Sequence, residues 1–399
     1  SNHFTFNIKN INKEVDLIFK FIIPFNKNIL EIQNDIKLNK IKINKLNNLF
    51  EKTKLIKKLL CDILYYDINL LPNELKNIKN INFFSQHKLL YNNFISFDII
   101  ESIKKMKYVI KVNYNNEKLF NLYCHNKKEC SFIKKKILKK ITTRILFLSN
   151  YLNVKKLPFL NIYYTNEKKK ISLNKKKIIY TPKEVNSAAT DNTNLIIIWR
   201  KEELLKSILH ECIHFYNLDI KNKNIISNYN TYFKNLFNVN KNNFINIGES
   251  YTEMNACFLN CIFYINENKK KIKNKKIIIK TFNENLKKEK EFSRFQVSKI
   301  LHLQSYKKFD DFYIKNKKTE INQTTNLISY HIIKSAFLHY INEIYKINSK
   351  DNLVLNFDSY SNIKNKEFEK LINIIFNKSN SLWIKLINKN IKTIKKTKK

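Results

Sequence analysis

Residues 210–214 read His210-Glu211-Cys212-Ile213-His214, an H-E-x-x-H sequence with two histidines four positions apart. Apolar residues recur around it at helical spacing, which predicts an amphipathic helix over about residues 202–216. Side chains four apart project from one face of a helix, so the two imidazoles can bind one Zn²⁺. Glu211 lies beside them, where a carboxylate can act as general base toward a metal-bound water.

A catalytic zinc site needs a third protein ligand and one open position. Residues 248–253 offer two carboxylates four apart at the start of a second predicted helix. We predict Glu249 as the third ligand and Glu253 as the residue that holds a liganding histidine in its metal-binding tautomer. A solvated helix face is the alternative interpretation of this pair. Gly248 is the only glycine in the 399 residues, which predicts a close backbone approach at this position.

The two helices together resemble the gluzincin group of zinc metallopeptidases, in which a glutamate ligand follows on a second helix. The stretches 186–190, 195–203, 249–260 and 329–336 also resemble metallopeptidases encoded by large DNA viruses of eukaryotes. The resemblance spans roughly residues 157–340, about half of the chain. It implies an α+β, mostly helical protein with a zincin-like catalytic domain, made of a small mixed sheet and the H-E-x-x-H helix.

The resemblance also implies a reaction, which is hydrolysis of a peptide bond with one Zn²⁺ per chain. In gluzincins a sheet edge binds the substrate backbone by strand addition, and a donor from a later helix stabilises the oxyanion. By this analogy residues 187–190 and 195–199 line the substrate cleft, and the implied substrate-binding residues are Ser187, Ala188, Ala189 and Ile197. An ordinary buried sheet is the alternative. The implied oxyanion donors are Tyr330 and His331.

Three segments are predicted along the chain. Residues 1–140 alternate apolar residues with Lys and Asn at helical spacing, with breaks near Pro24 and Pro72, and predict a helical N-terminal region. Residues 141–265 form the catalytic subdomain with the sheet and both site helices. Residues 266–399 form a helical C-terminal subdomain that ends in a disordered Lys-rich tail from about Lys389.

Within these segments, short Ile- and Tyr-rich runs predict strands, whereas longer periodic stretches predict helices. The strands are expected at 159–165, 177–181 and 195–200, and further helices at 282–302 and 326–347. The distance from His214 to Glu249 is longer than in the smallest gluzincins. The Asn- and Lys-rich stretch 217–243 is therefore predicted to be an inserted loop.

The composition indicates an AT-rich genome. The chain has 75 Lys and Arg against 33 Asp and Glu, a formal net charge of +42, and every cationic side chain is lysine except Arg144, Arg200 and Arg294. Lys, Asn and Ile have codons made of A and T alone, so base composition accounts for the excess. Such genomes are found in certain large DNA viruses of insects or protists, in apicomplexan parasites and in endosymbionts. We expect only weak, salt-sensitive contact with nucleic acid or another polyanion. The alternatives are a dedicated nucleic-acid-binding module and a catalytically inactive basic scaffold protein of a viral particle that retains a zincin fold.

The six cysteines show no disulfide-framework spacing and lie largely in apolar helical patterns. We predict reduced thiols and therefore a cytoplasmic or virion-interior protein. No secretion signal is recognisable, and no apolar run is long enough to span a bilayer. The expected partner is a peptide or protein substrate.

Overall fold

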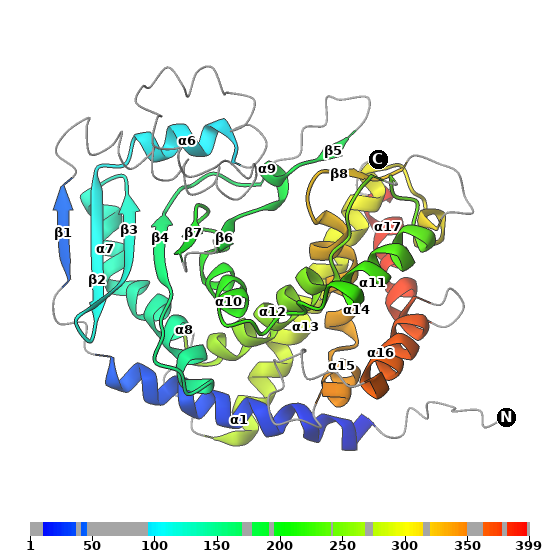
Figure 1. Cartoon of the computed structure of the whole chain (residues 1–399), viewed down its shortest axis with the longest axis horizontal. Coiled ribbons are helices and arrows are strands. Elements are labelled where there is room, and N and C mark those ends of the chain that lie inside the picture. Colours follow the sequence, from blue (N-terminus) through cyan, green and yellow to red (C-terminus); the bar gives the residue numbers. More distant parts are fainter. Residues whose placement is uncertain are drawn as a thin grey trace. The chain divides into compact units, whose positions relative to one another are not determined.

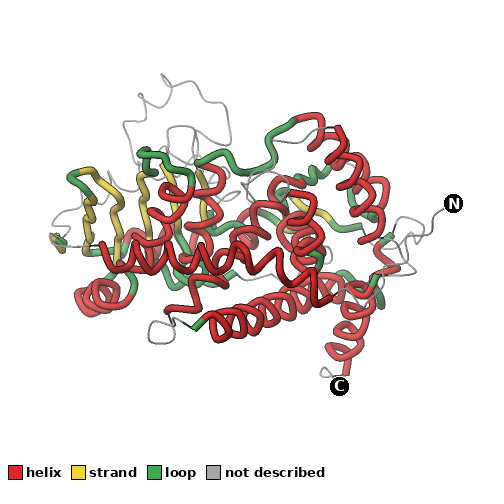
Figure 2. Tube along the Cα trace, turned by 90° about the horizontal axis from the view of Figure 1, so that it is seen from below, coloured by secondary structure: helices red, strands yellow, loops and turns green. Residues whose placement is uncertain are grey.

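The computed structural model describes residues 11–36, 41–45, 95–169, 178–190, 195–240, 242–267, 274–313, 320–348, 362–376 and 381–396. Helices occupy most of this trace and strands a smaller part of it (Figure 1, Figure 2). The prediction of a mostly helical α+β protein is confirmed. Within these residues, no helix has both the length and the apolar character needed to cross a membrane.

The chain divides into two compact units, each assembled from segments far apart in the sequence. The first, here called the sheet unit, consists of Ile32–Tyr216 and Asn322–Thr325. The second, the helical unit, consists of Ser1–Glu31, Asn217–Ile321 and Asn326–Lys399. The units are composed differently from the three consecutive segments that the sequence predicted.

A six-stranded mixed sheet forms the centre of the sheet unit, in the order β1-β2-β3-β4-β7-β6 (Figure 1). β3, β4 and β7 are parallel neighbours, whereas β1, β2 and β3 pair antiparallel and β6 pairs antiparallel with β7. The strands are β1 (Lys42–Lys45), β2 (Tyr108–Tyr114), β3 (Glu117–Cys124), β4 (Phe159–Tyr163), β6 (Ala188–Thr190) and β7 (Leu195–Ile198). The strands predicted at 159–165 and 195–200 are confirmed. The strand predicted at 177–181 is β5 (Ile179–Tyr180), which pairs with β8 (Asn322–Gln323) in a separate small sheet.

The predicted helical N-terminal region is wrong for residues 108–124, which form the β2–β3 hairpin. Asn115 and Asn116 connect these strands with φ of 48° and 66°, a left-handed conformation that asparagine tolerates in tight turns. Helices do form at α1 (Ile11–Asp35), which contains Pro24, at α6 (Phe97–Lys104) and at α7 (Lys127–Lys136). The predicted break at Pro72 and the cysteine at position 61 lie outside the described residues.

Different helices cover the two faces of the sheet. On one face, Ile99 and Ile103 of α6 join Tyr163, Ile197 and Trp199 in a buried cluster. Leu195 of β7 also belongs to this cluster, whereas Ile196 and Ile198 point to the opposite face, because side chains alternate along a strand. There α10 (Leu204–Phe215) contacts β6 and β7 and packs against α8 (Leu138–Tyr151), while the short α9 (Pro182–Val185) precedes β6. The helix that carries the H-E-x-x-H sequence is therefore held against the last two strands of the sheet.

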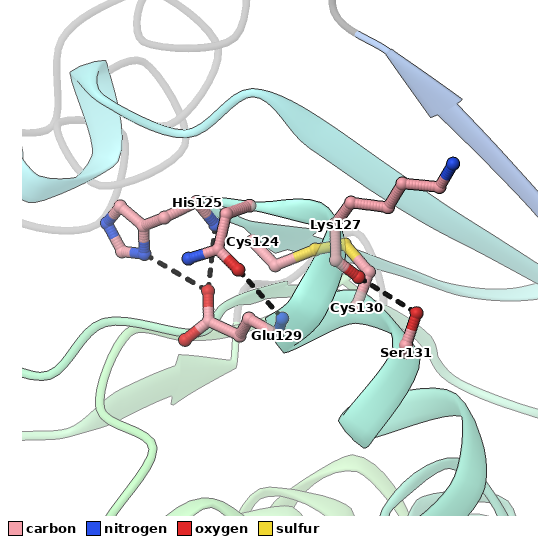
Figure 3. The surroundings of a disulfide bond; sticks show 7 residues. Cys124, His125, Lys127, Glu129, Cys130 and Ser131 are labelled. Atoms are coloured by element: carbon pink, nitrogen blue, oxygen red, sulfur yellow. Dashed lines mark hydrogen bonds and ion pairs between the residues drawn. A yellow bond between two sulfur atoms is a disulfide. The ribbon is translucent and has the colours of Figure 1, made fainter.

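A disulfide joins Cys124 at the end of β3 to Cys130 in α7, with their Cα atoms 6.1 Å apart (Figure 3). The prediction of reduced cysteines is wrong for this pair, because the hairpin and the turn into α7 place the two sulfurs together. Beside it, His125 Nδ1 lies 3.3 Å from Glu129 Oε2, and this hydrogen bond raises the pKa of His125 above its usual value. The remaining described cysteines, Cys212, Cys257 and Cys261, are buried and are not in a disulfide.

Removing the disulfide is expected to lower the free energy of unfolding. The bond closes a short loop with a sequence separation of 6, and its constraint on the unfolded chain stabilises the fold by about 2 kcal/mol. Urea unfolding of the Cys124→Ala/Cys130→Ala double variant measures this loss. A reductant should lower the unfolding midpoint of the wild-type protein and leave that of the double variant unchanged. Equal responses of the two proteins would contradict the prediction.

The helical unit surrounds a long buried helix, α12 (Ile247–Glu267), which packs against α11, α13, α14 and the π-helical turn η3. Its other elements are α11 (Lys223–Leu236), α13 (Lys275–Leu303), η2 (Phe309–Phe312), η3 (Ile328–Ile333), α14 (Lys334–His339), α15 (Ile341–Asn348), α16 (Asn362–Ile375) and α17 (Leu382–Lys396). The helices predicted at 282–302 and 326–347 are confirmed, the second as η3, α14 and α15.

Two predictions for this unit are wrong. The expected loop at 217–243 contains α11, which is capped by the side chain of Asn222 and anchored by the fully buried Phe233. The tail expected to be disordered is instead helical, because α17 extends to Lys396. Regularly spaced isoleucines give α17 an apolar face that packs against α13, and the lysines occupy its other faces. The buried isoleucines are Ile384, Ile387 and Ile391.

Candidate metal centre

α10 carries the H-E-x-x-H sequence in its last two turns. Ile208, Leu209 and Cys212 are fully buried and fix the side of the helix that faces the core. Burial raises the pKa of the Cys212 thiol, so this cysteine stays protonated beside the two histidines. His210 and Glu211 are each 6% exposed, and His214 is half-buried. The site side chains therefore lie in a largely dry environment.

The two histidines face each other. Their Nε2 atoms are 3.1 Å apart, and the planes of the rings meet at 72°. Two nitrogens bound to one tetrahedral zinc at 2.0–2.1 Å would be separated by about 3.3 Å. The pair thus has nearly the separation that one metal ion imposes, a separation that also fits a hydrogen bond between one protonated and one unprotonated nitrogen.

The structure brings together the three residues that the sequence predicted as ligands. One ligand atom each of His210, His214 and Glu249 lies within 4.8 Å of the other two. Among the described residues, this is the one group of three or more His, Cys, Asp or Glu side chains whose geometry could hold a metal ion. The cluster could bind a cation because it combines two imidazole nitrogens with one carboxylate oxygen.

The start of α12 fixes the position of Glu249 in the helical unit. Asn246 Oδ1 accepts a hydrogen bond from the Gly248 N–H at 2.9 Å, and the Asn246 N–H donates to Ser329 Oγ at 3.0 Å. A Cβ atom at Gly248 would lie only 2.8 Å from the carbonyl oxygen of Ile220. The close backbone approach predicted for the single glycine is confirmed.

Gly248→Ala is expected to destabilise the protein by about 1–3 kcal/mol, because the added methyl group overlaps a backbone oxygen. The start of α12 must then shift, and Glu249 shifts with it. Urea unfolding measures the loss of stability, and titration with Zn²⁺ measures the expected weakening of metal binding. Alanine favours a helix over glycine by up to about 1 kcal/mol, so a gain in stability would contradict the close contact.

A buried arginine braces the segment that leads into β6. Arg200 donates from Nε to the Asn186 carbonyl at 3.2 Å, from one terminal nitrogen to the Glu167 carbonyl at 3.0 Å, and from the other to the Lys183 carbonyl at 2.6 Å. These three hydrogen bonds from one guanidinium group hold three backbone segments together at the point where the chain passes from β7 toward α10.

The carboxylate of Glu203 forms a second set of hydrogen bonds in this region. Its Oε2 accepts from Ser187 Oγ at 2.6 Å and from Lys169 Nζ at 2.6 Å. Burial opposes the ionisation of Glu203, but the charges of Lys169 and Lys206 hold the pKa of this carboxyl well below its usual value. Residues 186 and 187 are therefore tied to the residues just before α10, which limits the movement of β6 against that helix.

The predicted substrate-binding side chains do not share one face. Ile197 is 2% exposed within the α6-facing cluster, and Ala189 packs against that cluster. These two side chains therefore point away from α10, and their predicted contact with a substrate stays a prediction. Ala188 lies on the α10 side, and the hydroxyl of Ser187 is bonded to Glu203. Strand addition along the β6 backbone stays a prediction.

One contact of the site was missed by the sequence analysis. Thr190 Oγ1 donates a hydrogen bond to Glu211 Oε2 at 2.5 Å. The resemblance implied only that residues 187–190 line the substrate cleft, and no contact between Thr190 and Glu211 was predicted. Strand alternation would have placed Thr190 on the same face as Ala188, toward the H-E-x-x-H helix.

The remaining predicted site residues lie on or against α12. Glu253 follows Glu249 by one turn and is 7% exposed. Tyr330 and His331 are half-buried in η3, a π-helical turn that packs against α12. Such turns are rare and frequently occur at functional sites. The predicted roles of these three side chains stay predictions.

Comparison with protein-family models, with curated proteins and with solved structures found no match to this chain. No family is assigned by similarity. The functional argument therefore rests on the residues and geometry described above.

Proposed function

We propose that this chain is a zinc-dependent peptidase of the gluzincin type. In this proposal His210, His214 and Glu249 bind one Zn²⁺, and Glu211 is the general base. The observation that carries the proposal is the convergence of three ligand atoms within 4.8 Å, with a buried carboxylate next to the first histidine on the same helix.

The donor set fits a catalytic zinc ion better than a structural one. Structural zinc sites usually close all four positions and favour cysteine, whereas catalytic sites combine three protein ligands with one exchangeable position. Cys212 is adjacent in sequence but fully buried, with a raised thiol pKa. Within the described residues the group has three members, all nitrogen or oxygen donors, which leaves the fourth position for a water.

When bound at these ligands, zinc supplies a water of lowered pKa and polarises the scissile carbonyl. Glu211 accepts the proton of the attacking water at a carboxylate oxygen and delivers it to the nitrogen of the leaving amine. Tyr330 or His331 donates to the oxyanion that develops at the carbonyl oxygen. Glu253 orients one of the histidine ligands.

The competing proposal is a catalytically inactive basic scaffold protein of a viral particle. A site with a merely structural role has no use for a carboxylate beside its ligands. The two proposals differ in metal content and in turnover, so both quantities decide between them.

The first measurement is the zinc content of the purified chain by plasma mass spectrometry, with hydrolysis of a quenched-fluorescent peptide library as the second. We expect about one zinc per chain and cleavage that a chelator abolishes and added Zn²⁺ restores. A chain that binds no zinc after reconstitution would overturn the proposal. One that binds zinc without cleaving any peptide would favour the scaffold protein.

A further inference from the structure

The hydrogen bond between Thr190 and Glu211 joins the last strand of the sheet to the proposed base. Thr190 ends β6, and its hydroxyl lies 2.5 Å from Glu211 Oε2, within the sheet unit. The residue Glu211 is 6% exposed, so few water molecules can replace this donor. A short hydrogen bond from a hydroxyl to a carboxylate is charge-assisted and among the stronger ones in proteins.

Both partners are held in place by the fold. Thr190 pairs with Ile196 in the β6–β7 ladder. The hydrogen bonds of Arg200 and Glu203 hold the residues just before β6 in place. Glu211 belongs to a helix whose other face is buried. The threonine hydroxyl is itself restricted, because branching at Cβ leaves few χ1 rotamers. The donor is therefore preorganised before any substrate binds.

A glutamate needs such a donor if it is to act as a base in one geometry. The terminal torsion (χ3) of a glutamate side chain has a broad distribution, so without a fixed partner its two oxygens occupy many positions. Proton transfer requires the base within about 2.6–3.2 Å of the proton donor, and a displacement of about 1 Å can cost about a hundredfold in rate. A donor on one oxygen restricts the plane of the carboxylate to one orientation.

We infer that Thr190 is a positioning residue that orients the Glu211 carboxylate for proton transfer, an inference that rests on the peptidase function proposed above. Thr190 does this through Glu211 and contacts neither the metal ligands nor the substrate in this role. Its loss therefore slows turnover without weakening zinc binding or substrate binding.

A purely structural role, in which the contact only holds β6 against α10, predicts different behaviour. Loss of the hydroxyl would then reduce stability, with turnover by the remaining folded protein unchanged. Thr190→Val removes the hydroxyl and keeps the shape of the side chain, whereas Thr190→Ser keeps the hydroxyl and removes a methyl group. The two variants separate positioning from packing.

The test uses the full-length zinc-loaded protein and one peptide selected from the library. Thr190→Val is expected to lower kcat by about tenfold to a hundredfold, with KM within about twofold and zinc content unchanged. Thr190→Ser is expected to recover most of the wild-type kcat. Thr142→Val is the matched control, because its buried hydroxyl donates to the Leu138 carbonyl within α8 and not to Glu211. It should leave kcat unchanged.

Two outcomes would overturn the inference: full kcat in Thr190→Val, or an equal loss in Thr142→Val. Thr190→Val should also add nothing to the loss in Glu211→Gln, because positioning an absent base has no effect. The contact has an independent readout in the zinc-free protein, where the unfolding midpoints of Thr190→Val, Glu211→Ala and the double variant should be non-additive, because alanine offers the threonine hydroxyl no acceptor. A wild-type protein that cleaves nothing while this coupling persists would refute the peptidase function and leave the contact established.

Discussion

Glu211→Gln is expected to lower kcat by about three orders of magnitude while the protein keeps about one zinc per chain. Glutamine has nearly the same shape, and its amide oxygen can still accept the hydrogen bond from Thr190. It cannot accept a proton from the attacking water, so the step that requires a base is lost. Zinc content, the unfolding temperature and kcat measured on the same preparation separate this loss from a loss of metal or of fold.

The matched control is Glu202→Gln, the same change at an exposed glutamate just before α10. It should keep wild-type kcat, because its carboxylate lies outside the group formed by α10 and Glu249. Hydrolysis by Glu211→Gln at the wild-type rate would refute the mechanism even if zinc is bound. A loss of zinc in Glu211→Gln would instead identify Glu211 as part of the metal site.

The ligand helix could be predicted because its information is local. Four-residue spacing puts His210 and His214 on one face of any helix, and the apolar pattern around them specifies which face is buried. The two histidines are accordingly 3.1 Å apart at Nε2. Gly248 was informative for a similar reason, since a lone glycine marks a place where a side chain would collide.

The errors have two causes. Some features depend on the tertiary structure, and some sequence patterns are compatible with two kinds of structure. Cys124 and Cys130 are only six residues apart, but this spacing does not indicate a disulfide until Cys124 is known to end β3 and Cys130 to lie in α7. The Lys-rich end was predicted as disordered because composition hid three isoleucines at helical spacing, which α13 buries. Strand patterns at 108–124 were masked by the same Ile–Lys alternation that fills the helices.

Thr190 shows why the site could be predicted only in part. A threonine at the end of a three-residue strand has no signature of its own, and its role arises from the pairing of β6 with β7 and the docking of α10. The candidate metal ligands were recognisable because zinc chemistry restricts such ligands to a few residue types. Residues that orient a base need only one hydrogen-bond donor in the right place, which many side chains can supply.

His214→Ala is expected to remove zinc and with it a large part of the stability of the folded protein. A ligand that binds only the folded state adds about 4 kcal/mol to the free energy of unfolding at a thousand times its dissociation constant. Without His214, two ligands remain, and binding of the ion becomes too weak to contribute at the same concentration. Zinc per chain and the unfolding free energy, each measured with and without a chelator, test this expectation.

The chelator provides the decisive comparison. Wild-type protein and His214→Ala should differ by several kcal/mol with zinc present and by about 1 kcal/mol once it is removed, the value of one lost hydrogen bond. His302→Ala removes a histidine from the last turn of α13 and should keep both the zinc and its stabilising effect. If zinc stabilised His214→Ala as much as the wild-type protein, the ion would bind elsewhere, and the two histidines of α10 would be only a buried hydrogen-bonded pair.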